Sequence, residues 1–251
     1  MNWTFGVNQT SPLQWALWKK KLDVVRLLVR YSADQEHISA HGWHPLFFCW
    51  PMLERDTDLR LDYMRLLAEN AHQDLSLVDV DGWTCLHRVA SIGNAEDVSE
   101  LIRLGADSTA FSMPLSWNAL QHAVFYGNEA AYSTLRPIFA SRLATMADER
   151  GWTLLHLAAA AGNAAIIDDL LCIGADPYAL TYPSGSEYLA ASLFQKRCTP
   201  AEVAANESEQ HLKLYHDAIQ QYEGAHGVTV RFEEIEEVSE CFWDAHEQLA
   251  A

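Results

Sequence analysis

An all-α solenoid of stacked helix-turn-helix units is the fold that the sequence predicts, and two observations carry this prediction. First, residues 82–87 read Gly-Trp-Thr-Cys-Leu-His, and residues 151–156 repeat them almost letter for letter. Second, each copy is followed by Gly-Asn and later by Gly-Ala-Asp. Because self-similarity of this kind is typical of repeat architectures, we expect a stack of small units and no single closed core.

A leucine that recurs in one slot sets the number of units. Its copies are Leu13, Leu46, Leu86, Leu120 and Leu155, which are 33, 40, 34 and 35 residues apart. This spacing is close to the period of roughly 33 residues of one family of two-helix repeats. A weaker sixth copy surrounds Ala201. We therefore predict about six units, near residues 8–40, 41–78, 79–112, 113–147, 148–195 and 196–223, followed by a separate segment at residues 224–251.

Each unit is expected to begin with a short helix. Thr84 and Thr153 can cap the first turn with their hydroxyls, and in other units a proline stands there, where its missing N–H costs little. Gly93, Gly127 and Gly162 allow a tight turn into a second helix, whose apolar residues recur at helical spacing. The glycine of Gly-Ala-Asp then ends that helix in a left-handed conformation, and a hairpin-like loop leads to the next unit.

This pattern resembles the ankyrin-repeat family, whose hallmark is Thr-Pro-Leu-His-x-Ala. The likeness covers about residues 8 to 223 and is strongest in the third and fifth units. In its overall sequence pattern the chain is similar to the ankyrin arrays of large fungal signalling and immune-type receptors. The resemblance implies an all-α ankyrin-repeat solenoid that binds proteins and is not an enzyme.

Some segments depart from the regular pattern. Residues 51–58 include about five extra residues, and a longer insertion occupies residues 178–196; both read as loops, either tolerated surface insertions or parts of a binding face. In the fourth unit Ser116 replaces the usual glycine, and Pro137 should end the second helix. Residues 233–243 are acidic and aromatic, and form either a helix that caps the last repeat or a docking segment that a partner captures.

The charge of the chain excludes some partners. A net charge of −17 makes nucleic acid a poor candidate, because a grip on phosphates needs clustered positive charge. Residues 1–30 are the exception, since five basic residues against Asp23 give a net charge of +4 and leave −21 for the remainder. This basic end either steers a partner or gives the terminal repeat a polar outer face.

We expect the protein to be intracellular, either cytoplasmic or nuclear. Its N-terminus lacks the basic and apolar regions of a secretory signal, and no segment reads as membrane-spanning or membrane-inserting. Five scattered cysteines, an odd number without metal-ligand spacing, agree with a reducing compartment.

The sequence assigns no catalytic residue, no cofactor and no metal site. It contains no Gly-rich phosphate loop, metal-spaced histidine cluster or serine elbow. His87 and His156 occupy a slot that in ankyrin proteins ties neighbouring units through hydrogen bonds. Cys85 and His87 are two residues apart, so on a helix they would not face each other. Asp79 and Asp81 could suggest a cation, but no calcium loop follows them.

A binding surface has better support. Four tryptophans occupy one register where each hairpin meets the next first helix: Trp43, Trp83, Trp117 and Trp152. In ankyrin proteins this slot lies on the concave side that contacts partners, and tryptophan is enriched among interface hot spots. We expect slots between the rings for partner side chains, flanked by Asp79, Asp81, Asp148 and Glu149. The alternative is that each ring packs on its own hairpin and helix start.

The function predicted from these observations is a non-catalytic scaffold or adaptor. Its partner would be a protein with apolar and basic side chains, bound on the concave hairpin and first-helix face. Two alternatives stay open at this point: a regulatory ankyrin arm or fragment of a larger signalling protein, and an enzyme with an unrecognised site near residues 178–196. Neither the partner nor the oligomeric state follows from the sequence.

Overall fold

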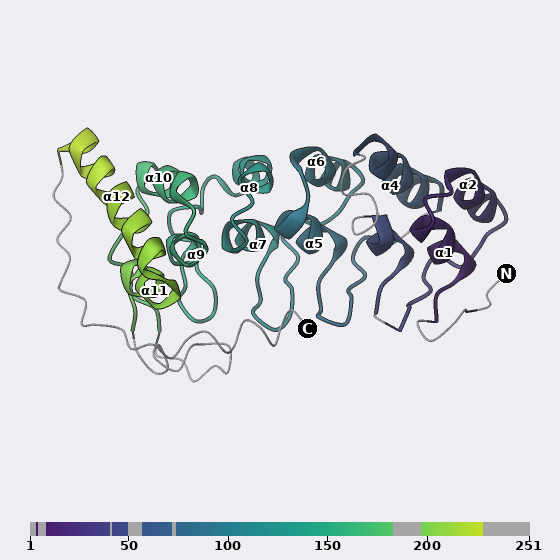
Figure 1. Ribbon diagram of the computed structural model, residues 1–251, viewed down its shortest axis with the longest axis horizontal. Coiled ribbons are helices and arrows are strands. Elements are labelled where there is room, and N and C mark those ends of the chain that lie inside the picture. The colour runs from purple at the N-terminus through teal and green to yellow at the C-terminus, as the bar shows by residue number, and fades with distance from the viewer. Residues whose placement is uncertain are drawn as a thin grey trace. The chain divides into compact units, whose positions relative to one another are not determined.

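Helices dominate the structure, which is a computed structural model. It describes residue 4 and residues 9–40, 42–49, 57–71, 74–182 and 197–227. In these ranges there are eleven α-helices and two 3-10 helices (Figure 1). Short antiparallel bridges join Val78 to Thr84 and Ala147 to Thr153 at the base of two hairpins. The predicted all-α repeat fold is therefore confirmed.

The helices follow one another in pairs, as the repeat pattern predicts. The pairs are α1 (Pro12–Trp18) with α2 (Leu22–Arg30), η1 (Pro45–Phe48) with α4 (Thr57–Ala71), α5 (Cys85–Ile92) with α6 (Ala95–Arg103), α7 (Ala119–Phe125) with α8 (Glu129–Leu135), α9 (Leu154–Ala161) with α10 (Ala164–Cys172), and α11 (Pro200–Glu207) with α12 (Glu209–His226). A second 3-10 helix, η2 (Arg136–Phe139), follows α8, so the α-helix ends before Pro137 as expected.

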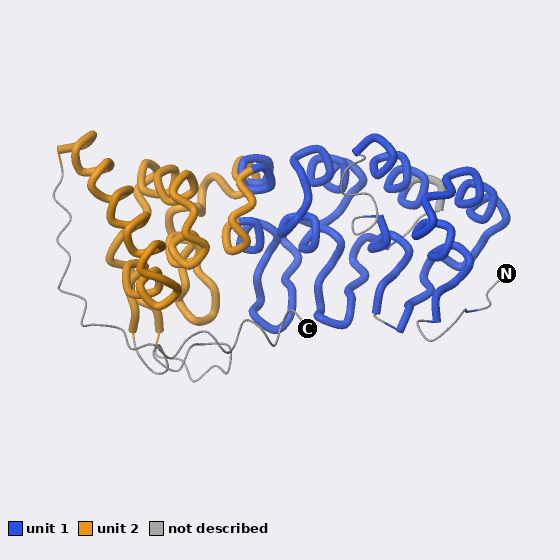
Figure 2. The backbone as a smooth tube through the Cα atoms, viewed as in Figure 1, with its two compact units in different colours: residues 1–123, 130–135 blue, residues 124–129, 136–251 orange. Residues whose placement is uncertain are grey.

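The chain divides into two compact units (Figure 2). The first consists of residues 1–123 and 130–135, and the second of residues 124–129 and 136–251. Within the first, α2 packs on α1 and α4, and α6 packs on α4 and α5. Within the second, α9 packs on α10, and both contact α12, while α11 packs on α9 and α12. Each unit is thus a stack in which a helix pair meets the pair beside it.

The leucine slot forms the core of this stack. Its five members are between 0% and 1% exposed, and Ala201 in the sixth copy is 2% exposed. Burying a leucine side chain stabilises a fold by about 1.5–3 kcal/mol, so one such position per repeat is a substantial contribution. The recurrence in the sequence therefore marks the positions that each helix presents to its neighbours.

A capping box begins the first helix of most units. Thr84 Oγ1 accepts a hydrogen bond from His87 N, and Thr84 N donates to His87 Nδ1 over 3.0 Å. This third helical position usually holds Glu or Gln, whose side chain reaches back to the cap. Gln14 fills it after Ser11, and Glu202 fills it after Thr199. The position that histidine fills in the third and fifth repeats therefore caps the helix, also where Gln14 or Glu202 occupies it.

Gly93 differs from the left-handed glycines that end other helices. Its φ is −83°, in extended backbone, whereas Gly162 has φ +62° at the equivalent position of the fifth repeat. A Cβ on Gly93 would lie 2.6 Å from Val89 Cγ1, so close approach to the preceding turn explains this glycine.

Candidate functional site: the hairpin surface

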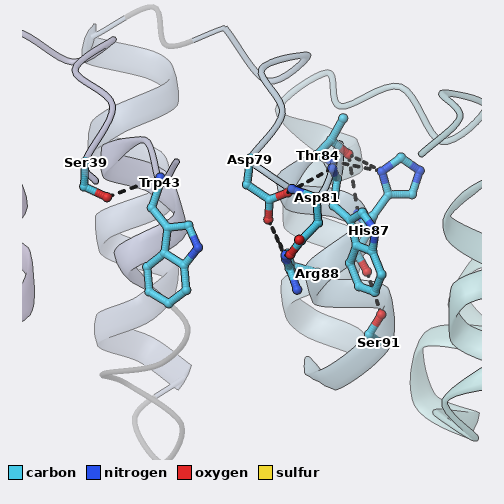
Figure 3. Close-up of polar contacts among 9 residues, drawn as sticks. Ser39, Trp43, Asp79, Asp81, Thr84, His87, Arg88 and Ser91 are labelled. Atoms are coloured by element: carbon cyan, nitrogen blue, oxygen red, sulfur yellow. Dashed lines mark hydrogen bonds and ion pairs between the residues drawn. The ribbon is translucent and has the colours of Figure 1, made fainter. Parts of the chain in front are cut away.

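The hairpins of Trp43, Trp83 and Trp152 are closed by the same backbone pattern around one buried polar residue. Asp79 N donates to Trp83 O over 3.0 Å, and Gly82 N donates to Asp79 O over 2.9 Å. Asp79 Oδ1 also accepts from Trp83 N over 3.0 Å. Asp148 makes the same bonds to Trp152. At the hairpin of Trp43, Ser39 replaces the aspartate with its hydroxyl (Figure 3). These side chains hold the hairpins together.

An arginine neutralises the aspartate and covers the tryptophan of the same hairpin. Arg88 Nε lies 2.7 Å from Asp79 Oδ2, its guanidinium also pairs with Asp81, and its carbon Cζ is 4.3 Å from the centre of the Trp83 ring. In the fifth repeat Arg150 lies 2.7 Å from Asp148 Oδ2 and 4.7 Å from the Trp152 ring.

These contacts give the predicted acidic residues different positions. Asp79 and Asp148 are buried, with side chains that are 0% exposed, and both are used inside their own hairpins. Asp81 and Glu149 are exposed. The expectation that all four carboxylates face a partner therefore needs correction for Asp79 and Asp148, because their oxygens already accept hydrogen bonds within their own hairpins.

The four tryptophans are also unequal. Trp117 is 3% exposed and Trp152 is 6% exposed, whereas Trp43 and Trp83 are half-buried. Three of the rings are covered by the residue five positions further along the chain: Phe48, whose ring centre is 5.6 Å from that of Trp43; Arg88 on Trp83; and His122, 5.6 Å from Trp117.

The expected slot between Trp83 and Trp117 is filled from within the chain. The His122 ring centre lies 4.2 Å from Trp83 as well as 5.6 Å from Trp117. Because the helix start brings its own side chains under the hairpin, no open slot remains between these two rings. Packing on the hairpin and helix start, the alternative from the sequence, describes Trp117 and Trp152.

Exposed apolar residues on the hairpins are the feature that the sequence reasoning missed. The residues that precede the buried polar position are all exposed: Ile38, Val78, Phe111, Ala147 and Leu180. Those that follow it are exposed too: Ala40, Val80, Met113, Glu149 and Tyr182. Val80 is 71% exposed, Phe111 64% and Met113 63%. The signal was the period-2 alternation around each polar residue, which places its two neighbours on the opposite face.

Some of these apolar residues pack against the turn glycine of the preceding hairpin. A Cβ on Gly42 would lie 2.3 Å from Val80 Cγ1, and one on Gly82 would lie 2.6 Å from Met113 Cβ. Met113 N also donates to Gly82 O over 3.2 Å. Each glycine therefore provides a contact surface for the next hairpin, and the exposed side chains project from a fixed backbone.

His87, His156 and Cys85 have structural roles. His87 Nε2 donates to Ala110 O over 3.0 Å, and His156 Nε2 donates to Cys198 O over 2.9 Å, as predicted for ties between repeats. Burial lowers the pKa of His156 to about 4, so the ring is neutral at pH 7. Burial also raises the pKa of the Cys85 thiol well above its usual value. A buried thiol of this kind is a poor nucleophile.

The described residues contain neither a cluster of metal-binding side chains nor a membrane-spanning helix. Over the described ranges, no three His, Cys, Asp or Glu residues lie close enough together to hold a metal ion. Among the helices that the structure describes, none combines the length and apolar character needed to cross a bilayer.

Comparison with known proteins supports the repeat pattern. The family model named Ankyrin repeat matches residues 81–111 and 150–182. A curated relative, L-asparaginase of Dirofilaria immitis, is 29% identical over 163 residues, which are 62% of this chain and 26% of the relative. The chain therefore spans about a quarter of that relative's length.

A solved structure shows the same fold. It is one chain of the complex between the Bd0816 predatory endopeptidase from Bdellovibrio bacteriovorus and immunity protein Bd3460, with a TM-score of 0.60 and 23% identity. The likeness covers 83% of this chain and 98% of that one. This likeness shows the fold, and the two repeats that the family model matches support an assignment to the ankyrin-repeat family.

Proposed function

We propose that the protein is a non-catalytic binding module, a scaffold or adaptor, that holds a partner protein on its hairpins. The proposed site, called the hairpin face below, consists of Ile38, Val78, Val80, Phe111 and Met113 in the first compact unit, where the hairpins project from one side of the helices (Figure 1). The observation that carries the proposal is the exposure of these apolar side chains on consecutive hairpins, from 45% for Val78 to 71% for Val80. Contiguous exposed apolar surface is typical of interaction sites.

The rigidity of the hairpins supports this assignment. The contacts of Val80 with Gly42 and of Met113 with Gly82 fix where the side chains stand before any partner arrives. A preorganised surface avoids part of the entropy that ordering costs on association. Trp83, half-buried under Arg88, would add the exposed part of its ring at the edge of the face.

The charge of the hairpins selects the partner. Residues 34–44, 74–84 and 107–117 contain six acidic residues and neither lysine nor arginine. Of these, Glu36, Asp74, Asp81 and Asp107 are exposed. Acidic borders around an apolar surface favour a partner segment that carries apolar and basic side chains, because complementary charge raises association rates and disfavours acidic partners.

A displayed library of random peptides would test the proposal without knowledge of the natural partner. We expect the selected peptides to be rich in apolar and basic residues. Val80→Asp with Met113→Asp should weaken their binding by about 2 kcal/mol or more, the range of interface hot spots. The matched control is Ile92→Asp, because Ile92 is 68% exposed at the end of α5 and lies outside the hairpins.

Each result of this experiment points to a different location or role of the binding residues. Peptides that bind the double variant and the wild type equally would exclude the hairpin face. Loss of binding in Ile92→Asp as well would indicate a general effect of added charge. Trp83→Ala measures the contribution of the half-buried ring; a loss of helical circular dichroism in that variant would make the ring structural.

A second candidate is a regulatory arm that works beside an enzyme. It is favoured by the match to a quarter of a relative named L-asparaginase. The array itself offers no cluster of ionisable side chains in the described part of the insertion, where Tyr178, Leu180 and Tyr182 are exposed; residues 183–196 lie outside the described residues. Release of ammonia from L-asparagine by the purified chain would contradict a purely binding role.

A further inference from the structure

The first repeat carries an apolar stripe on its outer surface. Its members, called the end stripe below, are Trp15, Val24, Leu27 and Tyr31, which are 43%, 45%, 52% and 66% exposed. The last three are spaced three and four residues apart, so they share one face from α2 to its C-cap, while Val25 is buried against the array. Exposed apolar side chains that share one face are typical of a surface that another protein segment covers.

Basic residues border this stripe. Lys19, Lys20, Lys21, Arg26 and Arg30 are all exposed. The Lys19 amine lies 4.8 Å from the centre of the Trp15 ring, and Arg26 makes only a loose 3.7 Å pair with Asp23, whose side chain is 99% exposed. Lys19 is therefore in contact with an exposed ring, and the other four basic residues lie in α2 or in the turn before it, so the repeat combines exposed apolar side chains with positive charge.

The C-terminal segment of the chain has the complementary chemistry. Between residues 233 and 240 it carries five glutamates, and its apolar residues Ile235, Val238 and Phe242 recur at spacings of three and four. On a helix these three would share one face opposite the acidic residues. Residues 228–251 lie outside the described residues, so this complementarity rests on the sequence of the segment.

We propose that the end stripe binds the acidic segment 233–243 of a second copy of this chain. Apolar residues of the segment cover Val24, Leu27 and Tyr31, and its glutamates face the lysines and arginines along the border. Such a contact joins unlike surfaces of two copies, so it is heterologous and extends to rings or open chains of molecules. The contact is separate from the hairpin face, and this proposal does not depend on the partner proposed there.

Sedimentation velocity of the full-length protein over a range of concentrations tests the proposal. The wild type should associate as concentration rises, and raising the salt from about 0.05 to about 0.5 M should weaken association at least tenfold, because exposed charges are screened within a few ångströms at high salt. A head variant, Val24→Glu with Leu27→Glu, and a tail variant, Ile235→Ser with Phe242→Ser, should each remain monomeric. The control Ile138→Glu, at a residue 46% exposed on η2, should associate like the wild type.

Mixing the two variants is the decisive step. The tail variant has an intact stripe and the head variant has an intact segment, so an equimolar mixture should form a dimer that stops at two molecules. Lys20→Glu with Lys21→Glu provides a head variant that changes only exposed charge and should also abolish association. A wild type that stays monomeric at every concentration, or a mixture that stays monomeric while the wild type associates, would overturn the proposal.

Discussion

Asp148→Ala should be among the most destabilising substitutions in the second compact unit. The side chain is 0% exposed, and each of its oxygens has defined partners. Oδ1 accepts from the backbone N–H groups of Arg150 and Trp152, both over 2.9 Å. Oδ2 lies 2.9 Å from Arg150 Nε and 2.7 Å from its Nη2. Alanine removes all four interactions and leaves the guanidinium, which is 11% exposed, without its carboxylate.

The expected magnitude follows from the pair that is broken. Removing one partner of a buried ion pair costs about 3–5 kcal/mol, because the other charge is left desolvated. Asp148→Asn keeps an oxygen acceptor for the two backbone groups, but its NH2 group cannot accept from Arg150, so the charge and both hydrogen bonds to the guanidinium are lost, and we expect a cost of about 1–3 kcal/mol. Glu149→Ala is the control at the neighbouring, exposed position, where the change should stay within about 0.5 kcal/mol.

Urea denaturation gives the change in stability, and hydrogen exchange in α9 and α10 shows whether it arises in the second unit. An Asp148→Ala variant that loses less than about 1 kcal/mol would refute this account of the hairpin. If that variant also failed to bind a partner, Asp148 would belong to the binding surface, as the sequence alone had suggested.

Three further predictions test other parts of the fold. Gly151→Ala should reduce stability more than Gly174→Ala. Both glycines have left-handed φ, +76° and +88°, which costs about 1–2 kcal/mol with a side chain, but only at Gly151 would the Cβ meet a neighbour, Tyr182 N at 2.9 Å. Equal urea midpoints of the two variants would contradict this contact. The wild type should lose stability as the pH falls from 6.5 to 4, because the unfolded His156 ring takes up a proton in that range and the folded ring, with its pKa near 4, does not. His156→Gln should reduce this loss. Between pH 7 and 5 the wild type should lose up to about 2 kcal/mol more than the variant in urea melts. Leu86→Ala should cost about 2–5 kcal/mol at a site 1% exposed, and an unchanged melt would undo the register of the leucine slot.

The sequence predicted the positions that repeat but not what covers them. The leucine slot recurs in five units, and the capping threonine with its histidine tie recurs in the third and fifth, so their spacing was sufficient. The coverage of the tryptophans does not recur in this way. Arg88 reaches Trp83 from five residues further along, whereas Arg150 reaches Trp152 from two residues before it. The same contact thus comes from two sequence positions, and no single period reveals it.

The apolar residues of the hairpins were missed for a related reason. Their alternation spans only three residues in each repeat, as in Val78, Asp79 and Val80, and such a short pattern resembles a loop of mixed composition. Its meaning depends on Asp79 turning inward to accept backbone hydrogen bonds, which forces both valines outward. A polar residue is buried here and apolar residues are exposed, the reverse of the usual assignment.

The uneven charge of the chain gives the two proposed surfaces opposite selectivity. The hairpins of the first compact unit carry acidic residues and no lysine or arginine, whereas the end stripe of the same unit is bordered by five basic residues. An apolar segment with basic residues is attracted to the hairpin face and repelled by the border of the end stripe. The acidic segment 233–243 experiences the reverse, so each site rejects the other's ligand as well as attracting its own. Apolar contact alone would not separate the two ligands, since both bring similar side chains, and the charge around each surface therefore decides which segment binds where.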